Sequence, residues 1–423
     1  MRILWLNSGL LGDACAVCGY DKVGACSWTQ AMIDELVAVA PEIKFCIVSL
    51  DYRHCDVSIE NVRHVSIQGR FTYNKTPLVI QERIRCIIKE FDPDVIHVQG
   101  TEYFYGCMDR SVYCGKPVVV SIQGVLSGIW PNVTGGLTRK DMRRAQLNPR
   151  FFLKGQTLFT EQNFWREMRA EQEARVFRSQ CNFIGRTEWD RQWMEYYNHA
   201  ARYFHVNESL RKPFYAVRRT AGSVRRHTIY CGAAASCALK GFHWLMRAVA
   251  ALKDEFPDMQ VRVAAADIYF SRPHSIGEYV RGQAYHSYLR SEVKRLGVGE
   301  NIIALPTLSA EEVANELAKA ELFVLPSMCE NSPNSLGEAM LVGTPSIATF
   351  VGGVPSIMKN GVEGKLIPSG DPAALAGAIR RWFLHPEEAE ACVAPARATA
   401  LKRHDARTNA EATLAVYGEL MGT

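Results

Sequence analysis

The sequence contains no apolar run that approaches the ~20 residues a membrane-spanning helix requires. Residues 1–8 become polar too soon for a secretory signal peptide and are more typical of a buried strand. The 13 cysteines are odd in number and dispersed, which is typical of free thiols in a reducing compartment and not of a disulfide framework. We therefore expect a cytoplasmic protein.

Several site signatures are also missing. Cys15 and Cys18 are close in sequence, but no second pair and no histidines follow at the spacing of zinc ligands. We interpret them as small semi-buried residues and expect no metal site. No Gly-x-Gly-x-x-Gly follows the first strand, which argues against a dehydrogenase that binds a dinucleotide. The net charge is only +5 and no nucleic-acid-binding motif accompanies it, so we expect no nucleic-acid partner.

One segment concentrates positive charge. Residues 139–178 carry ten Lys or Arg against five Asp or Glu, with phenylalanines and a tryptophan among them. Basic residues mixed with aromatic ones can bind an anionic membrane surface, here the inner membrane face. The alternative is an ordinary helix with one solvated side that covers a core. The sequence leaves both interpretations open.

The chain has 423 residues, enough for two or three domains of about 150 residues each. Short apolar runs, such as 3–6 and 95–98, predict strands that are buried on both faces. Apolar residues three and four apart, as in 80–91, predict helices between them. Alternating strands and helices indicate an α/β fold with parallel sheets and right-handed crossovers.

The alternating pattern stops and then restarts, which predicts two similar domains in tandem. We assign residues 1–210 to a first Rossmann-like domain, which we expect to hold the acceptor of a group-transfer reaction. We assign residues 211–226 to a basic linker. We expect residues 227–395 to form a second Rossmann-like domain, which would bind the donor substrate of that reaction. Residues 396–423 form a C-terminal helix, which we expect to pack back on the first domain. Open parallel sheets bind ligands at the carboxyl ends of their strands.

The strongest motif follows an apolar strand at 322–325. Glu330 comes just after the strand, the turn 331–335 follows, and a short helix then carries Glu338. Asn331 or Ser332 suits the N-cap of this helix and Pro333 its first turn. Free N–H groups in that turn, together with the helix dipole, make a site fit for a diphosphate. Carboxylates only accept hydrogen bonds, so both glutamates suit hydroxyl-rich partners such as ribose and a sugar ring.

Taken alone, Glu338 is more simply a surface residue on a helix. The whole segment is more specific, since it combines Glu330-x7-Glu338 with Gly343-Thr344-Pro345, Gly352-Gly353-Val354-Pro355, Gly361-Val362-Glu363-Gly364 and Gly370-Asp371-Pro372. Over residues 300–380 it closely resembles glycosyltransferase family four, a large retaining family with the GT-B fold. The resemblance implies two Rossmann-like domains that face each other across a cleft.

The resemblance also implies roles for single residues. Glu330 would contact hydroxyls of the transferred sugar, Glu338 would bind the ribose, and Lys240 would neutralise charge on the leaving phosphates. Glu330 and Lys240 are thus the predicted catalytic residues. The predicted nucleotide-sugar-binding set is Gly24, Thr307, Asn331, Ser332, Pro333, Asn334, Ser335, Leu336 and Glu338. His97, Gln123 and Arg186 are candidates for contact with the acceptor or sugar.

The sequence departs from the family pattern in three places. Gly232 is followed by residues 233–236, Ala-Ala-Ala-Ser, where the family usually has an arginine. One cationic side chain that would bind the donor phosphates is therefore missing or supplied elsewhere, with Arg186 as a candidate. Gln123 stands where the family often has a histidine, and glutamine can bind a sugar but cannot shuttle a proton. Of the usual paired glycines near the donor phosphates, only Gly24 is present.

These features predict a retaining transferase of a hexose-type sugar that needs no metal and no cofactor beyond the nucleotide-sugar co-substrate. A UDP-sugar is the favoured donor and a GDP-sugar the second choice. The acceptor would be a hydroxyl of a glycan, a glycolipid or a lipid-linked sugar, as in polysaccharide biosynthesis. Two alternatives stay open: a nucleotide-sugar epimerase on the same fold, and a catalytically silent partner of a transferase. The intact Glu330, Glu338 and Lys240 argue against the silent protein.

Overall fold

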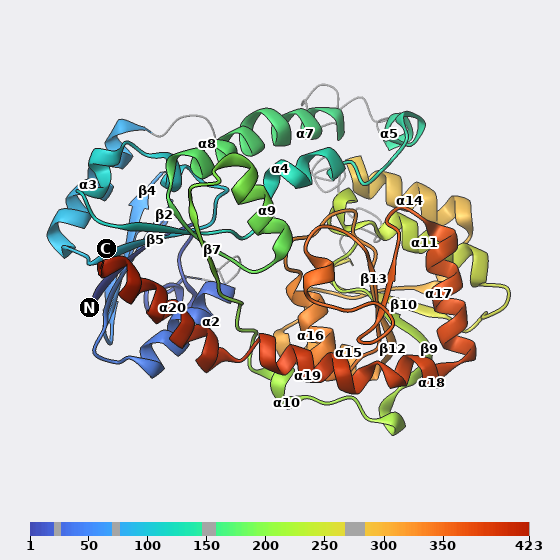
Figure 1. The fold of residues 1–423 in the computed structure, drawn as a ribbon. Helices are drawn as coiled ribbons and strands as arrows, with labels where there is room; N and C mark the ends of the chain where they lie inside the picture. The colour runs from blue at the N-terminus through green and yellow to red at the C-terminus, as the bar shows by residue number, and fades with distance from the viewer. Residues whose placement is uncertain (21–26, 70–76, 146–157, 267–283, 423) are drawn as a thin grey trace. The chain divides into compact units, whose positions relative to one another are not determined.

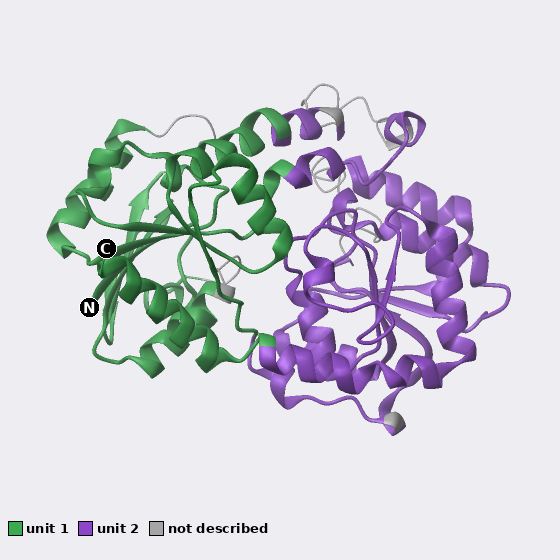
Figure 2. Cartoon of the chain, in the orientation of Figure 1, with its two compact units in different colours: residues 1–127, 166–210, 403–423 green, residues 128–165, 211–402 purple. Residues whose placement is uncertain are grey.

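The computed structural model describes residues 1–20, 27–69, 77–145, 158–266 and 284–422 (Figure 1). The chain divides into two compact units (Figure 2). Unit 1 contains residues 1–127, 166–210 and 403–423, and unit 2 contains residues 128–165 and 211–402. This division differs from the expected domains, because residues 128–165 and the expected linker at 211–226 both belong to unit 2.

Unit 1 is built on an eight-stranded sheet in the order β3-β4-β2-β1-β5-β6-β7-β8. All neighbouring strands are parallel except the antiparallel pair β3 and β4 at one edge. The strands are β1 (Arg2–Asn7), β2 (Lys44–Asp51), β3 (Asp56–Ile59), β4 (Val62–Gln68), β5 (Val95–Gln99), β6 (Val118–Ser121), β7 (Asn182–Gly185) and β8 (Arg202–His205). β1 and β5 lie in the middle of the sheet, which explains their continuous apolar sequences.

Helices pack on both faces of this sheet, and the core of unit 1 therefore has two halves. One half lies under α3 (Leu78–Phe91), α8 (Glu171–Ser179) and α9 (Glu188–Tyr197). The other half lies under α2 (Ser27–Val39) and α20 (Ala406–Met421), and α1 (Gly12–Val17) follows β1. The C-terminal helix α20 packs on α2, and its Tyr417 hydroxyl accepts a hydrogen bond of 3.0 Å from Trp5 Nε1.

Unit 2 has a six-stranded parallel sheet in the order β11-β10-β9-β12-β13-β14. Its strands are β9 (Arg225–Tyr230), β10 (Gln260–Val263), β11 (Ile302–Ala304), β12 (Ala320–Leu325), β13 (Ser346–Thr349) and β14 (Lys365–Ile367). Its helices are α5 (Arg139–Ala145), α7 (Leu158–Phe164), α10 (Pro213–Ala216), α11 (Phe242–Leu252), α14 (Ala284–Leu296), α15 (Ala310–Lys319), α16 (Asn334–Val342), α17 (Pro372–Leu384) and α18 (Pro386–Ala391). Three further elements include a boundary between the units: α4 (Leu126–Ile129), η4 (Trp165–Ala170) and α19 (Val393–Arg403).

Local sequence signals explain several helix boundaries in unit 2. Asp371 caps α17 by accepting hydrogen bonds from the N–H groups of Ala373 and Ala374, at 3.0 and 2.9 Å, as its position before Pro372 predicts. Ser309 caps α15 in a capping box. Within the described ranges, no helix combines the length and the apolar character that a membrane crossing needs.

The segment read as a linker is docked on unit 2. Its helix α10 packs on α15 and α16. Arg219 N–H donates to the carbonyl of Val342 at 2.9 Å, and the Arg219 guanidinium forms an ion pair of 2.6 Å with Glu390. Arg219 therefore has partners on the domain surface, which a count of charge and proline does not reveal.

Candidate functional site

A tight turn carries Lys240 beyond the carboxyl end of β9. The turn η6 (Ala238–Lys240) leads into Gly241, which has φ +71° and precedes α11. A Cβ atom on Gly241 would lie only 1.9 Å from the carbonyl oxygen of Pro326, in the loop after β12. The N–H of Met328 in that loop donates to the carbonyl of Leu239 at 2.8 Å. The two loops are therefore fixed against each other through their backbones.

This backbone contact brings the two predicted catalytic residues together. The Lys240 ammonium lies 2.7 Å from Glu330 Oε1, and the hydroxyl of Ser327 donates to the same oxygen at 2.7 Å. Gly353 N–H donates to the carbonyl of Glu330 at 3.0 Å. Glu330 is nearly buried and Lys240 is half-buried, with 38% of its side chain exposed. The charge of Glu330 raises the pKa of Lys240, so the lysine is a cation at neutral pH.

The helix α16 has Pro333 at its N-cap, whereas the sequence predicts Asn331 or Ser332 there. Pro333 is at the N-cap with φ −69° and ψ 108°, and no side chain caps this helix. The prediction that Asn331 or Ser332 caps the helix is therefore wrong. Leu336 N–H donates to the carbonyl of Pro333 at 3.0 Å, so the backbone itself closes the first turn. The N–H of Leu336, a residue of the predicted nucleotide-sugar-binding set, therefore already has a protein partner.

The other predicted donor-binding residues are spread over several loops. Asn334 and Ser335 are half-buried in the first turn of α16, while Asn331 is buried in the loop before it. Thr307 is exposed after β11. Gly24 lies outside the described residues.

Glu338 lies inside α16 with 7% of its surface exposed. Its Oε1 accepts a hydrogen bond of 2.8 Å from Arg211 Nη2, which is also an ion pair. Burial raises the pKa of Glu338 and the charge of Arg211 opposes this. The two glutamates of the motif therefore have separate cations, Lys240 for Glu330 and Arg211 for Glu338. Sequence reasoning missed Arg211, because it placed this residue in a linker.

A segment from the first half of the chain supports the Lys240 turn. The carbonyl of Gly135 accepts hydrogen bonds from His243 Nε2 at 3.0 Å and from Trp244 Nε1 at 2.9 Å. Gly135 has φ +67°, and a Cβ atom there would lie 2.3 Å from the carbonyl oxygen of Ala238. Burial lowers the pKa of His243 to about 3, which keeps this ring neutral. The Gly135-Gly136 pair is a sequence signal that could have indicated a close backbone approach at this point, but not its partner.

The candidate acceptor residues lie in unit 1, near the carboxyl ends of β5, β6 and β7. Arg186 is buried and forms an ion pair of 2.7 Å with Glu208, so its charge is already balanced within unit 1. Gln123 and Glu102 both lie close to Gly100. A Cβ atom added to Gly100 would be 3.5 Å from Gln123 Cδ and 2.3 Å from Glu102 Oε2. Burial raises the pKa of Glu102, and the positive charges of Arg169 and Arg186 partly offset this rise. No sequence motif marked Glu102 as part of this group.

His97 is packed inside unit 1 with no exposed surface. Its Nδ1 lies 2.7 Å from the hydroxyl of Tyr417 and its Nε2 lies 2.7 Å from the hydroxyl of Ser121. This placement makes His97 a link between β5, β6 and α20, and its contact with a sugar stays a prediction. Burial lowers the pKa of His97 to about 3, so the folded protein holds this ring neutral.

This burial predicts a pH dependence of stability. Between about pH 6.5 and pH 3 the unfolded chain binds a proton at His97 and the folded protein does not, so acidification favours unfolding. We expect His97→Gln to remove roughly 2 kcal/mol of the stability lost between pH 6.5 and pH 5. Urea unfolding at both pH values measures this difference. The exposed His199, changed to Gln, is the control and should keep the full pH dependence. An unchanged pH dependence in His97→Gln would contradict the assignment.

Two predictions about partners stay untested. Within the described residues, no group of three or more His, Cys, Asp and Glu is arranged to hold a metal ion. The expected independence from metals is a statement about activity and stays a prediction. In residues 139–178, Asp141 of α5 lies 3.7 Å from Arg247 of α11, which ties α5 to unit 2. Membrane contact through this segment also stays a prediction.

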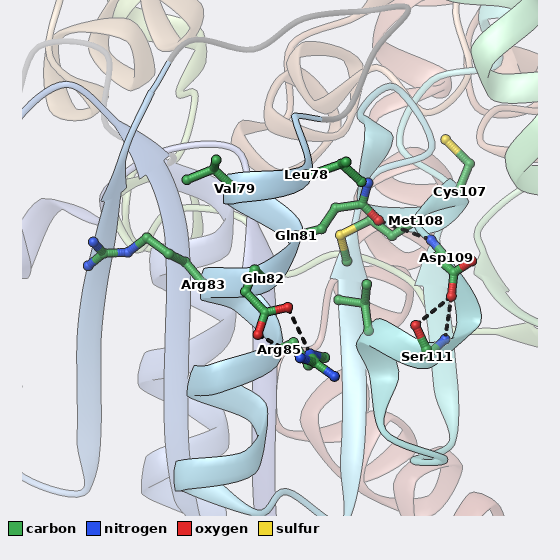
Figure 3. Close-up of a pocket in the computed structure, with 11 residues that line it drawn as sticks. Leu78, Val79, Gln81, Glu82, Arg83, Arg85, Cys107, Met108, Asp109 and Ser111 are labelled. Atoms are coloured by element: carbon green, nitrogen blue, oxygen red, sulfur yellow. Dashed lines mark hydrogen bonds and ion pairs between the residues drawn. The ribbon is translucent and has the colours of Figure 1, made fainter.

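A surface hollow of about 1030 Å³ lies on unit 1, beside α3 and the turns η1 (Phe104–Cys107) and η2 (Arg110–Tyr113) (Figure 3). Leu78 and Val79 stand exposed at one end of it. Glu82 and Arg85 form an ion pair of 2.6 Å on the same helix. None of the residues predicted from the motifs lines this hollow, so it is separate from the candidate site.

Comparison with known proteins places the match in unit 2. Residues 228–399 match the family described as Glycosyl transferases group 1. Curated relatives include the D-inositol 3-phosphate glycosyltransferases of Streptomyces coelicolor, 32% identical over 149 residues, and of Streptomyces griseus, 33% identical over 179 residues. These alignments cover 35% and 42% of this chain. The chain spans about a third of the length of these relatives, 31% and 36% respectively.

Solved structures with the same fold cover nearly the whole chain. Sucrose-phosphate synthase from Thermosynechococcus elongatus aligns with a TM-score of 0.72 and 15% identity over 100% of this chain and 99% of the other. Anabaena Alr3699/HepE in complex with UDP and glucose aligns with a TM-score of 0.66 and 14% identity over 99% and 100%. The fold is GT-B, with two α/β units that are each built on a largely parallel sheet. This part of the sequence prediction is confirmed.

Proposed function

We propose that the chain is a glycosyltransferase that moves a hexose-type sugar from a nucleoside-diphosphate sugar, with UDP favoured, to a hydroxyl of an acceptor. The family match of residues 228–399 supports this proposal. The single observation that carries it is the cluster of Lys240, Glu330 and Ser327. The cluster lies at the carboxyl ends of β9 and β12, which are neighbours in a parallel sheet, where α/β folds of this kind bind ligands.

The cluster supplies the charges that this reaction needs. When the sugar leaves, negative charge develops on the nucleoside diphosphate, and a fixed cation lowers the barrier by stabilising that charge. Lys240 is such a cation, because Glu330 and the Leu239–Met328 backbone bond hold its turn in place. Glu330 retains lone pairs for hydroxyls of the transferred sugar. The helix α16 begins shortly after Glu330 in the sequence, and the positive end of its dipole adds to this stabilisation.

Retention and independence from metal belong to this proposal. Lys240 and the start of α16 supply the electrostatic stabilisation of the leaving group, so the reaction should proceed in the presence of a chelator. The acceptor attacks from the face that the leaving group departs from, and the donor phosphate takes up the acceptor proton. The product should therefore keep the configuration at the anomeric carbon.

A donor and acceptor screen tests the proposal. The full chain is incubated with UDP-hexoses and GDP-hexoses, with and without acceptors, in the presence of a chelator. The acceptors include glycans, lipid-linked sugars and D-inositol 3-phosphate, the last because the relatives are named for it. Transfer with an α-linked product from an α-linked donor supports the proposal. Release of an altered sugar without acceptor indicates an epimerase, and binding without any turnover indicates a silent protein.

Arg211 gives a further prediction for the donor site. Its guanidinium orients Glu338 and opposes the rise in pKa that burial causes, and a carboxylate can accept hydrogen bonds from two ribose hydroxyls. We expect Arg211→Gln to weaken UDP binding roughly tenfold at pH 7, and more at pH 5.5, because the pKa of Glu338 rises when its cation is lost. Titration calorimetry with UDP measures this change. Arg218→Gln, an exposed arginine of the same segment, should bind UDP as the wild type does. Equal UDP affinities of Arg211→Gln and Arg218→Gln would contradict the proposed role of Arg211 in UDP binding.

A further inference from the structure

Two neighbouring cysteines, Cys15 and Cys18, gather with the distant Cys55 in one cluster of unit 1. Cys15 lies in α1, Cys18 is at the C-cap of that helix, and Cys55 comes just before β3. They share a small apolar cluster with Leu10 and Ala14. The Sγ atoms of Cys18 and Cys55 are 3.2 Å apart. Cys18 and Cys55 are 37 residues apart, so no local sequence pattern connects them.

The backbone on both sides of this contact is held by other interactions. The hydroxyl of Tyr20, two residues after Cys18, donates to the carbonyl of His54 at 2.8 Å. The N–H of Cys55 donates to Ser66 Oγ at 2.6 Å, and Ser66 N–H donates to the carbonyl of Cys55 at 2.7 Å. The end of α1 and the start of the β3–β4 hairpin are therefore docked together, and the two thiols meet as a consequence of this docking.

The two thiols differ in their access to solvent. Cys55 is 1% exposed and Cys15 is fully buried, whereas Cys18 is half-buried. Burial raises the pKa of Cys55 to about 12 and also raises that of Cys15. Reaction with an oxidant requires access and a thiolate. Cys18 is therefore the thiol of the cluster that a dissolved oxidant reaches first, with Cys55 behind it as the second sulfur.

We propose that Cys18 and Cys55 are a modification site that forms a reversible disulfide when the protein meets hydrogen peroxide. The Cys18 thiolate attacks one peroxide oxygen, the O–O bond breaks and hydroxide leaves. The hydroxide takes up the proton that the Cys18 thiol released on ionising, which gives a sulfenic acid and one water. The Cys55 sulfur then attacks the Cys18 sulfur and expels hydroxide, which leaves as a second water with the Cys55 proton. Two thiols and one peroxide thus yield one disulfide and two waters. A disulfide has an S–S distance of about 2.05 Å, so the sulfurs must approach by about 1.2 Å.

This cross-link would join α1 to the edge hairpin of the unit 1 sheet. It closes the chain between residues 18 and 55, a loop that contains α2 and β2. A covalent loop restricts the unfolded chain more than the folded one, so the oxidised protein should melt at a higher temperature. In a reducing compartment such a bond forms transiently and reports oxidation. The proposal does not depend on the glycosyl transfer proposed above.

Peptide mapping of the full chain tests the proposal. The native protein is treated with hydrogen peroxide, its remaining thiols are alkylated, and it is digested without reductant for mass spectrometry. We expect a cross-linked peptide pair that contains Cys18 and Cys55, the loss of two alkylatable thiols in this cluster, and reversal by dithiothreitol. The melting temperature should rise on oxidation and fall again on reduction.

Single substitutions separate this pairing from its competitors. Cys18→Ser and Cys55→Ser should lose both the cross-link and the rise in melting temperature, while Cys15→Ser should keep both. The exposed Cys86 should be alkylated or oxidised without any cross-link. A Cys15–Cys18 disulfide, or over-oxidation of Cys18 with Cys55 still free, would overturn the proposal. The wild-type map decides this even if one variant fails to fold.

Discussion

Lys240→Ala should lower the turnover number for sugar transfer by roughly 10²–10³-fold, the usual loss when one fixed group that stabilises transition-state charge is removed. The variant should stay folded, because Lys240 is 38% exposed and Ser327 still donates to Glu330 at 2.7 Å. Initial rates at saturating donor, with circular dichroism as the check on folding, measure the effect. Glu330→Gln should lose a comparable factor, since a neutral amide cannot hold Lys240 as the carboxylate does.

The controls for this pair come from α15 in the same unit. Lys319→Ala and Glu311→Gln change the same side-chain types at exposed positions and should leave turnover within a factor of about two. Binding of UDP alone should weaken in Lys240→Ala, because in the proposed mechanism the lysine contacts the phosphates before the sugar leaves. Turnover near the wild-type level in either Lys240→Ala or Glu330→Gln would remove the basis of the proposed mechanism.

Gly241→Ala should be among the most destabilising single changes in unit 2. An alanine at φ +71° costs about 1–2 kcal/mol for its backbone conformation alone. In addition, its Cβ atom would lie 1.9 Å from the carbonyl oxygen of Pro326, so the two loops must separate. That separation breaks the hydrogen bond from Met328 to Leu239 and moves Lys240 away from Glu330. Chemical unfolding and UDP titration should both show the loss.

Gly361→Ala is the matched control for this substitution. Gly361 has φ +76°, but nothing lies within 4 Å of a Cβ atom placed there. It should therefore show only the conformational part, about 1–2 kcal/mol, and keep its affinity for UDP. Equal losses of stability and affinity in the two variants would mean that the approach of Gly241 to Pro326 is not needed for the donor site.

The strands and helices, and the contact between Lys240 and Glu330, follow from the sequence for a common physical reason. Strands buried on both faces are continuous apolar runs, and in a parallel sheet the residues just beyond them gather at one edge. Lys240 follows β9 and Glu330 follows β12, so their contact follows from strand order. The cap of α17 at Asp371 is equally local, since it depends on adjacent residues only.

The missed features depend on contacts between distant parts of the chain. Gly135 and His243 are 108 residues apart, and no local pattern relates them. Arg211 reaches Glu338 across 127 residues, from a segment whose proline and basic residues are typical of linkers. Cys18 and Cys55 likewise meet only through the docking of α1 on the hairpin. The N-cap of α16 was assigned to Asn331 or Ser332 because Pro333 is acceptable on either side of that boundary.

Unit 2 is discontinuous in the chain, since residues 128–165 and 211–402 complete one compact body. A C-terminal half cut at residue 227 would present the His243 and Trp244 nitrogens without the Gly135 carbonyl that accepts from them. Chimeras that exchange donor preference between relatives should therefore carry the 128–165 insert along with the C-terminal segment. Exchanges made at the apparent midpoint of the chain would instead yield hybrids with an incomplete unit 2.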